Sequence, residues 1–161
     1  KWDILAVIEF TSTRKRMSIV CRSPEGKILL LCKGADNIIM ERLKKDGANL
    51  SPLQTTHEHL GEYAEIGLRT LCLAYKELSQ DEFETFNKKW YEASLSLVAR
   101  DELQGKIAAE LERDMLLVGA TAIEDKLQDG VPEAIETLAD AGIKLWVLTG
   151  DKQETAINIG F

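Results

Sequence analysis

The sequence has few of the residues that mark secreted or metal-binding proteins. Its 161 residues include only three cysteines, two histidines and three prolines. Cys21, Cys32 and Cys72 are widely spaced and lie in apolar stretches, so they fit neither a zinc motif nor a disulfide framework. We expect reduced core cysteines in a cytosolic domain. His57 and His59 face different sides of a helical pattern, so we assign no metal ligand.

Long apolar runs and excess positive charge are also missing. No run approaches the ~20 apolar residues that a transmembrane helix needs. Lys and Arg number 20 against 27 Asp and Glu, which gives a net charge of −7. Nucleic acids attract basic surfaces, so we expect no nucleic-acid partner. The sequence has no GxxxxGKS/T, GxGxxG, Ser-His-Asp or HExxH arrangement, and we assign no catalytic residue.

The apolar patterning that is present predicts an α/β fold that opens with an antiparallel sheet flanked by helices. Strand patterns cover residues 4–10, 17–22, 27–32 and 68–78. Helical patterns cover residues 37–45, 51–66 and 80–113, the last divided near Arg100. Ser79 and Glu82 form a capping box before the last of these. A turn over residues 23–26 makes the second and third strands a hairpin.

After residue 113 the pattern changes to strand, helix, strand and helix. Strands are expected over residues 114–123 and 143–148, with a helix over 129–141 between them. Gly119 lies inside the first of these strands, where glycine often marks the close approach of another backbone. We therefore expect a domain boundary near residue 113, with a first domain over 1–113 and a short, incomplete second piece over 114–161. Both ends of the chain look cut, which indicates a piece of a longer protein.

The residues after the last expected strand have the layout of a ligand site. Thr149, Gly150 and Asp151 separate that strand from a helical pattern, as at the ligand crevice of a doubly wound sheet. A bare carboxylate at Asp151 would repel phosphate, so the site would either work with a metal ion or position other groups. Asp125 follows the preceding strand and would line the same crevice if the two strands were parallel; surface loop charges are the alternative.

Other strand ends carry groups that suit a nucleotide. Phe10 offers a ring face to a base, and the cations of Arg14, Lys15 and Arg16 suit polyphosphate. The alternative is a buried strand-end phenylalanine before a solvated basic turn. Lys33 follows another strand beside Gly34, which permits close backbone approach; an ordinary strand–helix turn is the alternative.

Arg69 and Thr70 stand at the start of the fourth expected strand. The guanidinium of Arg69 is a planar fork of donors that suits a phosphate, and Thr70 adds a hydroxyl. An edge-strand arginine paired with a nearby glutamate is the alternative.

Taken in order, these segments resemble the cytoplasmic part of P-type ATPases. The segments are FTSTRKRMS, KGAD, GLRTL, AIEDKLQDGVPE and LTGDKQETA. Within that family, IEDKLQDGVPE and WVLTGDKQETAINIG resemble the P4 class, the phospholipid flippases. The resemblance covers essentially the whole chain. It implies that residues 1–113 form most of a nucleotide-binding domain, truncated at its start, and that residues 114–161 form part of a phosphorylation domain with a haloacid-dehalogenase fold.

The resemblance also implies roles for individual residues in binding ATP and Mg²⁺. Phe10 would stack on adenine, with Ser12 and Lys15 beside the nucleotide and Lys33 in the base pocket. Arg69 and Thr70 would contact the ribose–phosphate side. The γ-phosphate and its Mg²⁺ would lie near Thr149, Gly150 and Asp151, and Asp125 matches a loop near the phosphorylation site. Most of the metal ligands would lie outside this chain.

Several family motifs are absent from this sequence. It contains no DKTGT with its phosphorylated aspartate, no GDGxNDxxM and no TGES. The resemblance therefore implies a flippase that couples ATP hydrolysis through an aspartyl-phosphate to lipid transport, of which this chain alone is inactive. It further implies a phospholipid substrate, an accessory membrane subunit and the cytoplasmic face of a eukaryotic membrane.

Three alternatives stay open from the sequence. The parent could be a P-type cation pump, although such pumps usually carry a DPPR-like segment where this chain has EDKLQ. The chain could be a protein-interaction module that docks through the charged helical region 79–113. A soluble phosphohydrolase of the Rossmann-like class would need a DxD motif, and none surrounds Asp3, Asp36 or Asp81.

Overall fold

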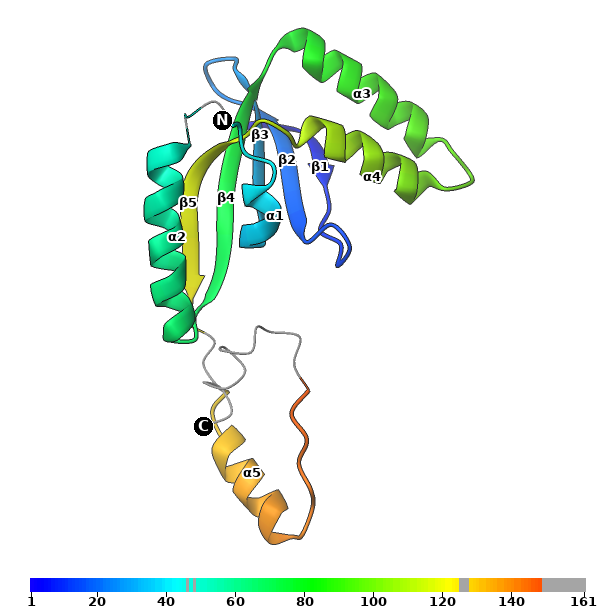
Figure 1. The fold of residues 1–161 in the computed structure, drawn as a ribbon. Helices are drawn as coiled ribbons and strands as arrows, with labels where there is room; N and C mark the ends of the chain where they lie inside the picture. Colours follow the sequence, from blue (N-terminus) through cyan, green and yellow to red (C-terminus); the bar gives the residue numbers. More distant parts are fainter. Residues whose placement is uncertain (46, 48, 125–127, 149–161) are drawn as a thin grey trace. The chain divides into compact units, whose positions relative to one another are not determined.

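The computed structural model describes residues 1–45, 47, 49–124 and 128–148 (Figure 1). In chain order the elements are β1 (Asp3–Ile8), β2 (Arg16–Arg22), β3 (Ile28–Gly34), α1 (Asp36–Met40), α2 (Leu50–Glu65), β4 (Arg69–Leu78), α3 (Gln80–Ser94), α4 (Arg100–Leu111), β5 (Leu116–Ile123) and α5 (Val131–Asp140). The chain divides into two compact units: residues 1–57 with 71–121, and residues 58–70 with those from 122 onward. No helix among the described residues is long and apolar enough to cross a bilayer.

The first unit is built around an antiparallel sheet of five strands in the order β1-β2-β3-β4-β5 (Figure 1). The sheet follows the sequence order, with each strand hydrogen-bonded to the next one in the chain, although two helices lie in each of the β3–β4 and β4–β5 connections. The expected hairpin between β2 and β3 is confirmed. Its turn is closed by the Ser23 amide, which donates to the Lys27 carbonyl at 2.8 Å.

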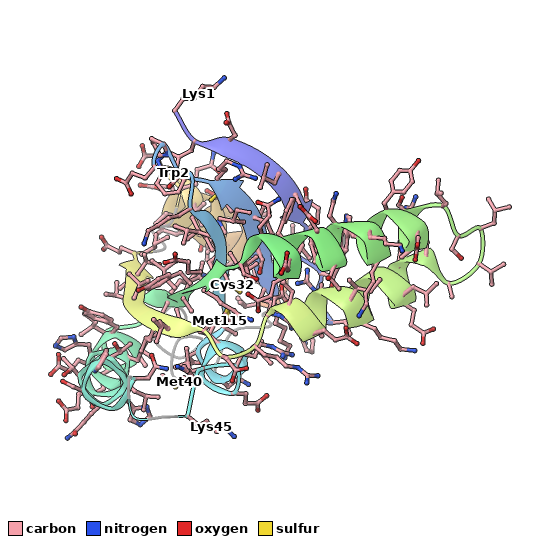
Figure 2. All side chains as sticks on the ribbon, turned by 90° about the horizontal axis from the view of Figure 1, so that it is seen from above. Lys1, Trp2, Cys32, Met40, Lys45 and Met115 are labelled. Carbon is pink, nitrogen blue, oxygen red and sulfur yellow. The ribbon has the colours of Figure 1, made fainter. Side chains whose placement is uncertain are left out.

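The two faces of the sheet have different surroundings. Helices α1, α3 and α4 lie on one side of the strands (Figure 2), and side chains facing them, such as Val20 and Leu30, are fully buried. Alternate residues, such as Met17, Ile19 and Leu31, point to the opposite face and are only half-buried. The core therefore lies on the helical side, and the other side of the sheet is left accessible.

The capping box expected before α3 is present. The Ser79 hydroxyl accepts a hydrogen bond from the Glu82 amide at 3.1 Å, and the Ser79 amide donates to the Glu82 carboxylate at 2.9 Å. The division of the following helical region is also confirmed, because α3 ends at Ser94 and α4 begins at Arg100.

Two expected elements differ from the structure. The strand expected over 143–148 is wrong, because these residues have no regular secondary structure and Trp146 and Leu148 are 83% and 92% exposed. A strand exists only through hydrogen bonds to a neighbour, and an apolar run does not supply one. The helix expected over 37–45 ends at Met40, because the chain that follows binds to Met115 instead.

Gly119 was expected to mark a close backbone approach, and that reason is wrong. A Cβ built on Gly119 would meet no atom within 4 Å. Its φ of +152° lies in a region that L side chains rarely adopt. The backbone conformation therefore explains the glycine in β5.

β5 follows the boundary expected near residue 113, yet it is hydrogen-bonded to β4 in the sheet of the first unit. Hydrogen bonds with Arg42, Lys44 and Asn49 fix the start of β5. The Met115 amide donates to the Arg42 carbonyl at 3.1 Å, and the Lys44 amide donates to the Met115 carbonyl at 2.9 Å. The Asn49 side chain accepts from the Leu117 amide at 2.8 Å. The described part of the chain contains no second sheet.

Candidate functional site

The candidate site begins with the loop that joins β1 to β2, which carries the expected base-stacking residue. The loop is closed by the Lys15 amide, which donates to the Thr11 carbonyl at 2.8 Å, and by the Arg14 amide, which donates to the Thr11 hydroxyl at 3.1 Å. Lys15 adopts a left-handed φ of 52° before the chain enters β2. Phe10 is 60% exposed, so the alternative of a buried strand-end phenylalanine is wrong.

The KGAD segment lies directly against this loop. Arg16 and Gly34 are partners in the β2–β3 ladder, and the Ala35 amide donates to the Lys15 carbonyl at 3.1 Å. A Cβ on Gly34 would lie 2.6 Å from the Arg16 Cβ and 2.8 Å from the Lys15 carbonyl oxygen. Only glycine permits this approach, so the expected role of Gly34 is confirmed and the two motifs are in contact.

A pocket opens on the sheet face that the helices leave uncovered. Its volume of about 440 Å³ lies in the range of small-molecule sites. Its lining is Met17, Ser18, Ile19, Leu31, Cys32, Lys33, Leu73, Ala74 and Val118. Lys33 is the charged residue of this lining, and its ladder partner is Met17. An apolar floor with one charged hydrogen-bond donor suits a flat ring that carries hydrogen-bond acceptors.

The other expected site residues have different positions. Ser12, Lys15 and Lys33 are exposed in the first unit, close in the chain or in the ladder to the β1–β2 loop. Arg69 and Thr70 begin β4 and are grouped with the second unit; Arg69 is exposed and Thr70 is half-buried. Thr149, Gly150 and Asp151 lie outside the described residues, as does Asp125.

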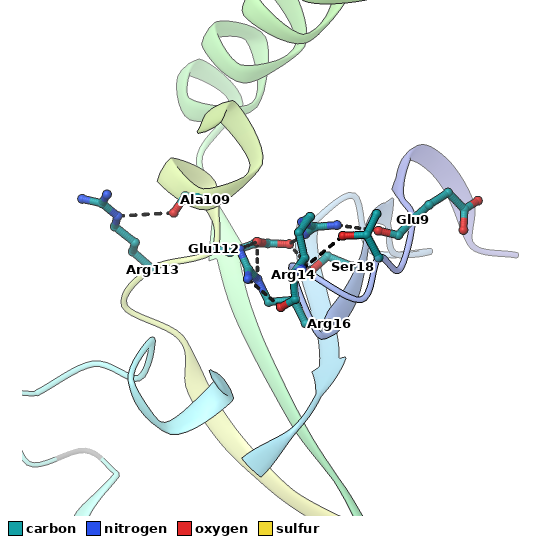
Figure 3. A network of polar contacts seen from close by, with 8 residues as sticks. Glu9, Arg14, Arg16, Ser18, Ala109, Glu112 and Arg113 are labelled. Carbon is teal, nitrogen blue, oxygen red and sulfur yellow. Dashed lines mark hydrogen bonds and ion pairs between the residues drawn. The ribbon is translucent and has the colours of Figure 1, made fainter. Parts of the chain in front are cut away.

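Arg14 and Arg16 do not face solvent as polyphosphate ligands, and that expectation is wrong. Both guanidinium groups contact the carboxylate of Glu112, whose side chain is fully buried at the end of α4 (Figure 3). The Arg16 Nε donates to the carboxylate at 2.6 Å, and the Ser18 hydroxyl donates to it at 2.7 Å. Lys15 is therefore the cation of this loop that is left exposed.

The surroundings of this ionic cluster shift two neighbouring pKa values. Burial raises the pKa of the Cys32 thiol, an effect that a hydrogen bond with Ser18 partly opposes. Burial and the nearby charge of Arg16 lower the pKa of Arg42. The protein thus gathers several guanidinium groups around one buried carboxylate on the helical side of the sheet.

Sequence reasoning missed Glu112. It lies in a strongly charged helical stretch, and nothing in its local pattern separates it from neighbouring glutamates such as Glu110. Its hydrogen-bond partner Arg16 is 96 positions away along the chain. Only the fold brings the two residues together.

Comparison with known proteins places these features in a family. The model for "P-type ATPase, cytoplasmic domain N" matches residues 1–130. The chain is 57% identical over 161 residues to phospholipid-transporting ATPase 10 of Arabidopsis thaliana, covering 99% of this chain and 13% of that protein. It is 55% identical over 161 residues to phospholipid-transporting ATPase IC of Homo sapiens, covering 99% of this chain and 12% of that protein.

A similar match extends to a fungal relative. The chain is 57% identical over 159 residues to a phospholipid-transporting ATPase of Schizosaccharomyces pombe, covering 99% of this chain and 12% of that protein. The chain thus spans only about an eighth of the length of these relatives, and the matches confirm the resemblance to the P4 class. The chain belongs to the P-type ATPases and contains the cytoplasmic domain N of that family.

Proposed function

We propose that this chain binds an adenine nucleotide and is the ATP-binding part of a phospholipid-transporting P-type ATPase. The observation that carries the proposal is the apolar pocket with Lys33 in its lining, next to a loop that exposes Phe10 and Lys15. Domain N of the family implies ATP as the ligand. An aromatic face, an apolar floor and isolated cations match the base and the phosphates of that ligand.

The proposed roles follow the chemistry of each side chain. Phe10 stacks on adenine, and Lys33 lies at the base pocket. Ser12 and Lys15 lie beside the nucleotide. Arg69 and Thr70 contact its ribose–phosphate side, since a guanidinium and a hydroxyl are suitable donors to those oxygens.

The end of the chain would serve the reacting end of the nucleotide. We propose that Thr149, Gly150 and Asp151 lie near the γ-phosphate and its Mg²⁺, within a phosphorylation domain whose Rossmann-like fold begins in the second half of this chain. Mg²⁺ would neutralise charge on the phosphate oxygens. Most ligands of the ion lie elsewhere in the parent, as does the aspartate that takes the phosphoryl group. This chain alone therefore binds nucleotide without turning it over.

The parent protein is proposed to move a phospholipid from the cytoplasmic face of a eukaryotic membrane, together with an accessory membrane subunit. The relatives in Arabidopsis thaliana, Schizosaccharomyces pombe and Homo sapiens are named for phospholipid transport. Their names favour a flippase over a cation pump as the parent.

Nucleotide titration tests the proposal directly. ADP added to the ¹⁵N-labelled chain should shift the amide signals around Phe10 and Lys33, with a dissociation constant near the millimolar range, about −4 kcal/mol. Phe10→Ala should remove most of the response because the stacking surface is lost. Tyr91→Ala is the matched control, because Tyr91 is an aromatic of similar exposure (64%) on α3. Equal responses from Phe10→Ala and the unaltered chain would rule out stacking.

The contribution of Lys33 to ADP binding can be tested against a control lysine that lies just before the other end of β3. Lys33→Gln should weaken ADP binding severalfold, since the base pocket loses its charged hydrogen-bond donor. Lys27 precedes the opposite end of β3 and is paired with Glu77 at 3.2 Å. Lys27→Gln should therefore leave the titration unchanged, and similar losses in both variants would indicate a general charge effect rather than a site.

A further inference from the structure

We infer that Glu112 is a positioning residue for the nucleotide-binding loop. Its buried carboxylate fixes Arg14 and Arg16 and, through them, the backbone that presents Phe10 (Figure 3). The consequence for binding rests on the proposed function, whereas the effect on the loop does not. Among the described residues of the pocket lining, Glu112 is hydrogen-bonded to Ser18, and its carboxylate lies on the helical side of the sheet, so it acts through the loop.

The contacts of Arg14 connect the carboxylate to the residue before Phe10. One end of the guanidinium contacts Glu112, and the other donates from Nη1 to the Glu9 carbonyl at 2.5 Å. Glu9 immediately precedes Phe10 in the chain. A single planar group thus joins a buried carboxylate to the backbone at the start of the exposed loop.

Arg16 holds the other end of the same loop. Its Nε and Nη2 both lie 2.6 Å from the Glu112 carboxylate, and its Nη1 donates to the Arg14 carbonyl at 3.0 Å. The backbone on both sides of Lys15 is therefore tied to one carboxylate. Lys15, with its left-handed φ of 52°, lies between these two anchored arginines.

Glu112 itself is held by rigid elements. Its amide donates to the Ala108 carbonyl at 3.0 Å in the last turn of α4, and its side chain is fully buried. Three residues later Met115 is fully buried and is hydrogen-bonded to Arg42. The carboxylate is thus anchored between α4 and β5, and the loop is the part free to change if the bond is lost.

A purely structural role is the competing explanation. A buried ion pair contributes little net stability compared with well-packed apolar groups, but removal of one partner leaves the other charge buried and uncompensated. A structural role therefore predicts a global loss of stability spread over the sheet. A positioning role predicts a change concentrated in residues 9–16, with the protection of β3 and β4 preserved.

Amide hydrogen exchange on the whole chain separates the two roles without any nucleotide. Glu112→Gln keeps the shape of the side chain and removes its charge, and it should speed exchange at Lys15 and its loop neighbours by at least about tenfold. Glu110→Gln is the matched control, because Glu110 lies on the same helix in an exposed pair with Lys89 at 3.3 Å. Exchange in the loop equal to that of the control, or raised equally throughout the sheet, would overturn the inference.

A second variant covers the case in which Glu112→Gln does not fold. Arg14→Gln removes the link from Glu112 to the Glu9 carbonyl at a side chain that is 13% exposed, so one guanidinium can leave without burying a new charge. It should reproduce the loop-specific increase in exchange. An unchanged loop in a folded Arg14→Gln chain would overturn the inference as well.

The link to function is tested by a double-variant cycle with ADP. Glu112→Gln should weaken ADP binding about 3- to 30-fold in the unaltered background and less than about twofold when Phe10 is already alanine, since coupled residues are non-additive. Additive losses would mean that Glu112 does not act through Phe10. If the unaltered chain binds no ADP, the proposed function fails, and hydrogen exchange still decides the effect of Glu112 on the loop.

Discussion

Three consecutive cations in the β1–β2 loop have different structural roles. Arg14 and Arg16 are tied to the buried Glu112, whereas Lys15 between them is exposed in a left-handed conformation. Guanidinium groups suit the buried pairs because each presents several donors in a fixed plane, and an ammonium would leave carboxylate lone pairs unmet. The contacts with Glu112 therefore separate the two structural cations from Lys15, which is left exposed to solvent.

Replacement of Gly34 tests whether the close contact between the β1–β2 loop and the KGAD segment is needed for stability and binding. Gly34→Ala places a Cβ 2.6 Å from the Arg16 Cβ and 2.8 Å from a backbone oxygen, neither of which can move cheaply. We expect a loss of about 1–3 kcal/mol in the free energy of unfolding, together with weaker ADP binding, measured by urea unfolding and titration. Gly61→Ala in α2 is the control. Its Cβ would meet nothing within 4 Å, and alanine should stabilise the helix by up to about 1 kcal/mol. A neutral Gly34→Ala would show that β2 and β3 can separate at this point.

At the scale of elements, the sequence predicted the features that depend on neighbouring residues. The hairpin turn, the strands β2, β3 and β4, and the capping box of α3 all follow from patterns within a few residues. The stretch 143–148 did not follow its pattern, because a mainly apolar run needs a hydrogen-bonding neighbour to become a strand. The pairing of Arg16 with Glu112 could not be predicted from the sequence either, because 96 positions separate the two residues.

The capping box of α3 gives a prediction with a pH dependence. Ser79→Ala removes the acceptor for the Glu82 amide and should cost about 1 kcal/mol. The hydrogen bond from the Ser79 amide, and then the charge of Lys76, hold the pKa of Glu82 below its ordinary value of 4.5. Because the folded pKa is depressed, this stabilisation is present above about pH 4.5 and is lost as the pH falls through the folded value. The free energy of unfolding of Glu82→Gln should equal that of the unaltered chain at low pH and be lower at neutral pH. Glu92→Gln, which changes an exposed glutamate on the same helix, should show no such pH-dependent difference.

Asn49 joins Lys44 to the start of β5, and its replacement should lower the free energy of unfolding. Its side-chain amide donates to the Lys44 and Met115 carbonyls at 2.9 and 3.2 Å, and its oxygen accepts from the Leu117 amide. Asn49→Ala removes the acceptor of the buried Leu117 amide, although the Met115 carbonyl keeps its hydrogen bond from the Lys44 amide. We expect a loss of about 1–3 kcal/mol in the free energy of unfolding, measured by heat or urea. A loss below about 0.5 kcal/mol would indicate that water replaces the amide at this site.

At the scale of the whole molecule, the two faces of the sheet have different roles. The helical face contains the core and the Glu112 cluster, and the opposite face contains the pocket with Lys33. A net charge of −7 makes a polyanion an unfavourable partner for most of the surface. Binding of ATP would therefore depend on a few local cations, which is consistent with the weak affinity we expect.

The extent of the first structural unit is open to a direct test by truncation. A chain that ends at Arg113 keeps the domain expected from the sequence but loses β5, with the buried side chains of Met115 and Leu117 and the partners of Asn49. Burying two such side chains contributes several kcal/mol, which is comparable to the net stability of a small domain. We expect this chain to lack a cooperative unfolding transition by circular dichroism. A chain that ends at Glu124 keeps all five strands and should unfold cooperatively and respond to ADP at Phe10 and Lys33. If the shorter chain were folded and the two melted alike, β5 would be an accessory to the sheet, and the domain boundary near residue 113 would gain support.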